Sequence, residues 1–155
     1  MDKDIIAGID VSTKKIAVVT LYSDNPVPVI WEAISTEPLV AERFSDLIEQ
    51  FYLYMIGHNA NIAVVETIPF VQNARTALAL ANIEGAVRAV CSLLGIPCEQ
   101  INNSVWKKTL GIGRTKEAVA AYVEAKGGYN IVSQDAKDAY CIVLAWKTLK
   151  ENNDR

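Results

Sequence analysis

Short apolar runs and longer segments of helical periodicity alternate along this chain. The first third holds three apolar runs bounded by polar residues, at 5–11, 16–22 and 27–33, which is typical of strands. The tight polar turn between the first two runs favours a β-hairpin. A helix is expected next, with Thr36 as its cap. Its apolar positions fall at helical spacing and are Phe44, Leu47, Ile48, Phe51 and Met55.

The rest of the chain alternates predicted strands and helices. An antiparallel opening followed by this alternation indicates an α/β fold with a mixed five-stranded sheet flanked by helices. At 155 residues we expect a single domain over 1–150 and a polar, fraying tail over 151–155. The predicted elements are strands at 61–66 and 97–101, and helices at 73–94, 104–110 and 115–125, with a final helix capped by Ser133.

The alanine-rich segment 73–94 carries two distinct faces. One is an apolar stripe that can pack on a sheet, formed by Leu80, Ile83, Val87, Val90 and Leu94. The other face carries small side chains, which allow another helix to approach closely, and includes Ala79, Ala86 and Ala89. A helix with two such faces is a candidate dimerisation element.

Composition indicates a folded protein of a reducing compartment. Hydrophobic residues make up 51% of the chain, which contains no low-complexity tract. The odd number of cysteines, Cys91, Cys98 and Cys141, and their lack of metal-ligand spacing predict buried free thiols. We find no leader and no stretch approaching the roughly 20 apolar residues of a membrane span, so we expect a soluble, cytoplasmic protein with no membrane partner.

The net charge of the chain is unusual for a nucleic-acid binder. It is -3, from 15 basic and 18 acidic residues, whereas phosphate contacts favour a basic surface. Four carboxylates gathered to hold metal would account for more than this excess, and bound divalent cations would reverse the local sign. The negative net charge therefore does not exclude a metal-dependent enzyme that acts on nucleic acid.

Two predicted strands end in a carboxylate. Asp10 follows one apolar strand and Glu66 closes another. Asp10 alone could simply cap the turn that follows it. If the two strands are parallel neighbours, however, both acids lie on the edge of the sheet where α/β proteins bind ligands.

A second pair of acids lies in the last predicted helix. Asp135 and Asp138 are three residues apart and so share a helix face. Asp135 could merely offset the helix dipole, whereas the small and apolar neighbours of Asp138 indicate close packing. If these acids meet Asp10 and Glu66, the oxygen-only cluster suits Mg²⁺ or Mn²⁺, and two such ions suit phosphodiester hydrolysis. We expect His58 to be a surface residue.

The order of these motifs resembles the RuvC family of Holliday junction resolvases, within the ribonuclease H-like nucleases. The resemblance extends over nearly the whole chain, through Gly8-Ile9-Asp10, Val64-Val65-Glu66, Val105-Trp106-Lys107-Lys108 with Gly111-Ile112-Gly113, Lys116, and Asp135-Ala136-Lys137-Asp138-Ala139. It implies a homodimer that nicks a four-way DNA junction symmetrically. It also implies that Asp10 bridges two Mg²⁺ ions, which Mn²⁺ can replace, and that Glu66, Asp135 and Asp138 complete their coordination.

The resemblance also implies DNA-contacting residues. Lys116 and one of Lys107 and Lys108 would lie near the scissile phosphate, and Phe70 would contact unstacked bases. The residues themselves agree in part, since a Gly-x-Gly turn before a helix offers backbone donors to an anion. Two alternatives stay open. The lysines and Arg114 could belong to an ordinary solvated surface, and Phe70 could be an ordinary packed side chain. Lys14, Lys15, Arg75 and Arg88 are further candidates for a positive track.

Other functions stay open beside the resolvase. Residues 8–13 also resemble the phosphate-binding turn of the sugar kinase, actin and heat-shock ATPase superfamily. Those proteins need two copies of the fold, and this chain has no internal repeat, so we expect no nucleotide cofactor. A nuclease for flaps, forks or RNA–DNA hybrids would carry the same acids, whereas a catalytically silent binding module would be expected to have lost some of them.

Overall fold

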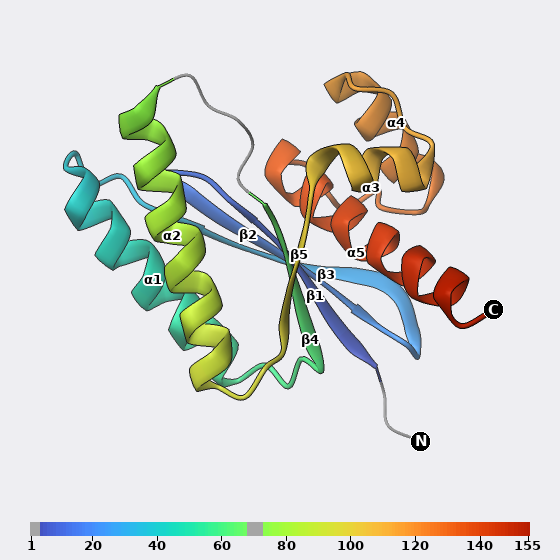
Figure 1. The fold of residues 1–155 in the computed structure, drawn as a ribbon, viewed down its shortest axis with the longest axis horizontal. Coiled ribbons are helices and arrows are strands. Elements are labelled where there is room, and N and C mark those ends of the chain that lie inside the picture. The colour runs from blue at the N-terminus through green and yellow to red at the C-terminus, as the bar shows by residue number, and fades with distance from the viewer. Residues whose placement is uncertain (1–3, 68–72) are drawn as a thin grey trace.

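The structure, a computed structural model, describes residues 4–67 and 73–155. Within them five strands form one mixed sheet with helices on both faces (Figure 1). The elements are β1 (Ile5–Val11), β2 (Lys15–Tyr22), β3 (Asn25–Ile34), α1 (Val40–Ile56), β4 (Ile62–Glu66), α2 (Ala74–Leu93), β5 (Cys98–Ile101), α3 (Asn103–Leu110), α4 (Lys116–Ala125) and α5 (Gln134–Asn153).

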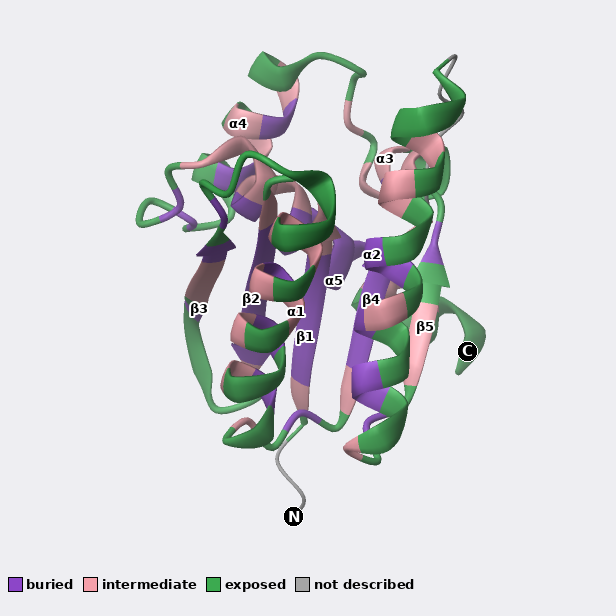
Figure 2. Ribbon diagram, turned by 90° about the vertical axis from the view of Figure 1, so that its left-hand side faces the viewer, coloured by how far each residue is buried: buried purple, intermediate pink, exposed green. Residues whose placement is uncertain are grey.

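The sheet combines a hairpin meander with parallel strands. Its order is β3-β2-β1-β4-β5, in which β1, β2 and β3 pair antiparallel, while β4 pairs parallel to β1 and β5 parallel to β4. Helices α1 and α2 cover one face, and α3, α4 and α5 lie on the other (Figures 1 and 2). The predicted α/β fold with a mixed five-stranded sheet is therefore confirmed.

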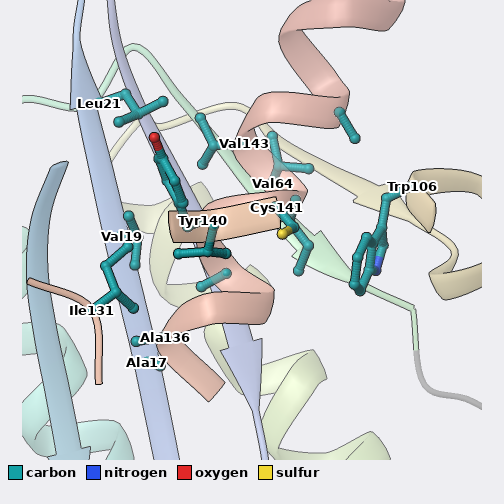
Figure 3. Packing of buried hydrophobic residues seen from close by; sticks show 14 of the residues in the cluster. Ala17, Val19, Leu21, Val64, Trp106, Ile131, Ala136, Tyr140, Cys141 and Val143 are labelled. Carbon is teal, nitrogen blue, oxygen red and sulfur yellow. The ribbon is translucent and has the colours of Figure 1, made fainter. Parts of the chain in front are cut away.

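The central strands are apolar on both sides because both faces of the sheet are covered. On the α1 and α2 side, Ile9 and Val65 pack with Phe51 in one core cluster. On the other side, Val64 packs with Trp106 and residues of α5 in a second cluster (Figure 3). The period-two alternation thus sends neighbouring residues of one strand into different cores.

The predicted cap of the first helix is wrong. Helix α1 begins at Val40, and its N-cap residue Leu39 makes no side-chain cap hydrogen bond. Pro38 disfavours helical geometry at the residue before it, which keeps the chain extended past Thr36. Arg43 stabilises this start instead, because its guanidinium donates to the carbonyl oxygen of Pro38 at 3.0 Å.

The other predicted helix starts lie within one residue of the observed ones. Asn73, Thr115 and Ser133 cap α2, α4 and α5, each accepting a hydrogen bond from a backbone N–H of the first turn. Helix α5 continues to Asn153, so residues 151–153 of the expected tail are helical, although their side chains are exposed.

Helix α2 is more apolar than we expected. Its 20 residues are long and apolar enough for a membrane span by length and composition, so the expectation that no segment comes near this limit is wrong. In the structure Ile83, Val87 and Val90 pack against the sheet, as in the core helix of a soluble protein. Only 28% of its most apolar window is buried within the chain.

His58 is not the surface residue that its polar neighbours indicate. It is half-buried, its Nε2 lies 2.8 Å from the Thr20 hydroxyl, and its ring stacks on Tyr54 at a centroid distance of 4.9 Å. Burial lowers the pKa of His58. The contacts come from strand β2 and from the preceding turn of α1, which a local sequence pattern does not reveal.

Candidate metal and nucleic-acid site

The two strand-end acids lie side by side. Strands β1 and β4 are parallel neighbours with Ile9 opposite Val65, so the next residues, Asp10 and Glu66, share one edge of the sheet. The turn after Asp10 is held by Ser12, whose Oγ accepts a hydrogen bond from the backbone N–H of Lys15 at 3.0 Å. A turn-capping role therefore does not account for Asp10.

Helix α5 brings the second pair of acids to the same edge. It crosses β1 at Gly8, where a Cβ atom would lie 2.2 Å from the carbonyl oxygen of Ala139. Gly8 is two residues before Asp10, and Ala139 directly follows Asp138. This close backbone contact places the amino-terminal part of α5 beside the end of β1.

The four acids are close enough to influence one another electrostatically. Burial, followed by the charges of Glu66, Asp138 and Asp135, raises the pKa of Asp10 well above its usual value. Burial also raises the pKa of Glu66 and that of Asp138, and each is partly offset by hydrogen bonds. Carboxylates that repel one another in a desolvated place are stabilised by a bound cation.

Three side-chain donors contact the acids and were not predicted from the sequence. Glu66 accepts from the indole Nε1 of Trp106 at 2.9 Å and from Nδ2 of Asn103 at 3.3 Å. Asp138 accepts from Nε2 of Gln134 at 2.9 Å. Asn103 and Trp106 are three residues apart, as on one helix face, but the helix predicted over 104–110 did not include Asn103.

Asp135 has a cationic partner. The Nζ of Lys15 lies 3.7 Å from its carboxylate and 3.6 Å from that of Glu32, which also accepts a hydrogen bond from Ser133. Lys15 is thus an ion-pair partner at the margin of the acid cluster, and not a free contributor to a positive track. Lys14 is exposed in the adjoining turn, at the same end of β1 as Asp10.

The acids suit a hard divalent cation by their chemistry. Their donor atoms are all oxygens, the preferred ligands of Mg²⁺ and Mn²⁺. In residues 4–67 and 73–155 no group of three or more histidine, cysteine, aspartate or glutamate side chains is already arranged to hold an ion. Among the described residues, the acids are close enough to influence one another's pKa, but no three of them surround one common point.

Two lysines face the acids. The charge of Lys107 lowers the pKa of Glu66 and of Asp138, and that of Lys116 lowers the pKa of Asp138. Lys107 also lines a hollow beside the acid edge, and the other residues of this hollow are Asn103, Ser104, Lys108, Ile112 and Arg114. Of the two adjacent lysines, Lys107 is thus the one whose charge acts on the acids.

The remaining basic candidates are dispersed. Arg75 is exposed in the first turn of α2. Arg88 acts electrostatically on Cys98, at the start of β5, so it lies toward the opposite end of the sheet from Glu66. Phe70 lies outside the described residues. The cysteines are free, as expected, with Cys91 and Cys141 buried and Cys98 half-buried.

Comparison with known proteins shows a shared fold and a partial sequence similarity. No family model matches the chain. RuvC of Thermus thermophilus has a TM-score of 0.78 at 18% identity, over 96% of both chains. The same protein solved with a Holliday junction substrate has a TM-score of 0.75. The yeast mitochondrial Holliday junction resolvase Ydc2 has a TM-score of 0.61 at 14% identity, over 96% of this chain and 83% of that one.

Sequence similarity points to the same proteins. The crossover junction endodeoxyribonuclease RuvC of Nitratidesulfovibrio vulgaris is 36% identical over 84 residues, and that of Carboxydothermus hydrogenoformans is 29% identical over 126 residues. The chain is similar in sequence to RuvC proteins and has the fold of the solved RuvC structure. The first match covers 54% of this chain and about half of the relative, 51%, whereas the second covers 78% and 79%. The RuvC-type fold confirms the resemblance drawn from the motifs.

Proposed function

We propose that this RuvC-type chain is a Mg²⁺-dependent endonuclease that resolves four-way DNA junctions by paired, symmetric nicks. The observation that carries the proposal is the convergence of Asp10, Glu66, Asp135 and Asp138 on one edge of the sheet, faced by Lys107 and Lys116. The relatives named above are crossover junction endodeoxyribonucleases, and one solved relative holds a junction substrate.

The four acids would hold two Mg²⁺ ions, which Mn²⁺ could replace. Asp10 is the acid on which the other three charges act, so it is suited to bridge the two ions. Bound Mg²⁺ would lower the pKa of an attacking water and offset the charge that develops on the phosphate and the leaving oxygen. Asp138 and Glu66 also accept the hydrogen bonds from Gln134 and Asn103 described above.

The basic residues would bind the DNA backbone. Lys107 and Lys116 are next to the acids and are assigned to the scissile phosphate, with Lys116 as a catalytic residue. Lys108, Arg114, Lys14 and Arg75 would contact flanking phosphates, and Phe70 would contact unstacked bases. Because these cations surround an acidic centre, the net charge of -3 is compatible with DNA binding.

Helix α2 is the proposed dimer interface. Leu78 is 66% exposed on a helix whose apolar window is mostly uncovered by the rest of the chain. An apolar helix surface of this kind is stabilised in water when a second copy covers it, and a two-fold dimer matches a two-fold symmetric junction. We place the protein in the cytoplasm, where free thiols persist.

The test compares a labelled four-way junction with a matched linear duplex, in Mg²⁺ and in chelator. We expect paired nicks in the junction alone, dependent on metal and absent in the variant Asp138→Asn. If flaps or RNA–DNA hybrids are cut while the junction stays uncut, the proposed substrate is wrong, but the assignment of the four acids as the active site is retained. If the protein binds DNA but cleaves no substrate, the proposed nuclease activity is wrong and a catalytically silent binding module is favoured.

A further inference from the structure

Glu66 is held at both carboxylate oxygens by a single helix. Its Oε2 accepts from the indole N–H of Trp106 at 2.9 Å, and its Oε1 accepts from the amide of Asn103 at 3.3 Å. A carboxylate with two fixed donors has its rotation restricted as well as its position. This arrangement differs from that at Asp138, where the donor, Gln134, belongs to the same helix as its acceptor.

The backbone around Glu66 explains why α3 reaches it. Glu66 pairs with Ile101, the last residue of β5, and α3 begins two residues later at Asn103. Asn102 caps this helix, its Oδ1 accepting from the backbone N–H of Ser104 at 2.9 Å. Asn103 and Trp106 are three apart and so project from one face of α3, toward the end of β4.

Trp106 is a rigid donor. Its side chain is fully buried in the core cluster that includes Val64 and Cys141, as Figure 3 shows. An indole N–H can only donate, and a buried one requires an acceptor. Glu66 is that acceptor, so the packing that fixes the indole ring also fixes one oxygen of the acid.

We propose that Trp106 and Asn103 are positioning residues that preset the Glu66 carboxylate for a divalent cation. This inference rests on the proposed function. Each oxygen of an ionised carboxylate offers about two acceptor directions, so one donor on each leaves each oxygen a free direction for a metal. Partners of this kind fix metal ligands before binding, and their removal typically lowers metal affinity by about 10–100-fold.

The experiment follows metal binding without DNA. The chain has three tryptophans, so its indole N–H signals in a nitrogen-15 spectrum are few and can be assigned by single Trp→Phe variants. During a Mg²⁺ titration we expect the Trp106 signal to shift until saturation, while those of Trp31 and Trp146 stay in place. Trp106→Phe and Asn103→Ala should each weaken Mn²⁺ binding, measured by calorimetry, by about tenfold or more.

The matched control is Trp146→Phe. Trp146 also donates its indole N–H to a glutamate, Glu99, at 2.6 Å, but that pair is outside the acid cluster. The control should therefore bind Mn²⁺ like the unaltered protein. On a junction substrate, the Trp106 and Asn103 variants should need more metal for half-maximal cleavage and recover most of the maximal rate at saturating metal.

The outcomes separate this inference from the proposed function. If the unaltered protein binds metal and cleaves the junction, and both positioning variants keep its metal affinity, the positioning role is overturned and the nuclease stands. If the unaltered protein neither binds a divalent cation nor cleaves, the proposed function fails and the inference fails with it. Should Trp106→Phe not fold, Asn103→Ala decides alone, because Asn103 is only half-buried.

Discussion

Gly8 in β1 lies against the backbone of Ala139 in α5 with no room for a side chain between them. A Cβ atom at Gly8 would be 2.2 Å from the Ala139 carbonyl oxygen and 2.4 Å from a methyl group of Val143. Since Asp10 and Asp138 flank this contact, the distance between strand and helix also sets the distance between two acids of the proposed site. Fold stability and site geometry thus depend on the same glycine.

Gly8→Ala should destabilise the protein by about 3 kcal/mol, because the methyl group must displace backbone atoms in a packed core. Denaturant unfolding followed by circular dichroism measures the change. Gly57→Ala is the matched control: Gly57 has a negative φ and nothing within 4 Å of a Cβ, so its effect should stay within about 0.5 kcal/mol. Equal stabilities of the two variants would contradict the close contact.

Asp10→Asn should stabilise the metal-free protein while abolishing cleavage. Burial and neighbouring acids raise the pKa of Asp10, so the folded state favours its protonated form. The contribution of protonated Asp10 to stability is complete at acidic pH, below the pKa that Asp10 has in the unfolded state. It is lost as pH rises through the pKa that Asp10 has in the folded state. The advantage of the variant should therefore grow as pH rises above about 4 in chelator.

Added Mg²⁺ should reverse that order. Binding to the folded state stabilises the unaltered protein by about 2.7 kcal/mol when free metal is a hundredfold above the dissociation constant. Asp10→Asn should gain much less, because it lacks the bridging ligand. Thermal unfolding with and without Mg²⁺ measures both effects, and an equal gain in the two proteins would argue against a metal site at Asp10.

Local patterns were sufficient to predict most of the fold. The apolar runs of β1, β2 and β4 stand out because these strands are covered on both faces, and Asn73 and Ser133 begin helices with ordinary capping chemistry. Thr36 was misassigned because a polar residue before an apolar pattern resembles a cap, whereas the effect of Pro38 on the chain moves the helix start to Val40.

The acids of the site could be predicted because strand ends and helix spacing are visible in sequence. The hydrogen-bond partners could not, since Trp106 and Asn103 meet Glu66 across separations of 40 and 37 residues. The pairing of Lys15 with Asp135 likewise depends on α5 returning to the first hairpin. Contacts of this kind follow from the topology, which single-sequence patterns constrain only indirectly.

His58 should make stability fall at acidic pH. Burial lowers the pKa of His58, so the folded state favours the neutral ring. The neutral ring contributes fully to stability above the pKa of His58 in the unfolded state, and this contribution is lost as pH falls through the pKa in the folded state. His58→Gln removes this titration and keeps a polar group near Thr20. The stability difference between the two proteins should thus change between about pH 7 and about pH 5, measured by denaturant unfolding. A constant difference would contradict the buried ring.

Leu78→Glu should shift the proposed dimer toward monomer. Leu78 is exposed on α2, and a charge placed in an apolar interface should raise the dimer dissociation constant by about tenfold or more. Sedimentation equilibrium measures it. Leu53→Glu, at a similarly exposed leucine on α1, serves as the control. A monomeric unaltered protein, or equal effects of both variants, would exclude α2 as the interface.

Lys107 and Lys108 should differ in what their loss changes. The charge of Lys107 acts on Glu66 and Asp138, so Lys107→Gln should slow cleavage of bound junction by about a hundredfold, as expected when one group that stabilises developing charge is removed. Lys108 is exposed in the hollow beside the acids. Lys108→Gln should instead weaken junction binding and reduce the slope of log affinity against log salt by roughly 0.9, the contribution of one phosphate contact.

Single-turnover cleavage at saturating protein separates the two effects, because binding no longer limits the rate. Under these conditions Lys108→Gln should approach the unaltered rate, whereas Lys107→Gln should stay slow. The reverse result would move the scissile phosphate away from Lys107 and toward the outer part of the hollow. Equal, purely salt-dependent losses would mean that both lysines only hold the DNA backbone, leaving Lys116 as the cation that acts on Asp138 during cleavage.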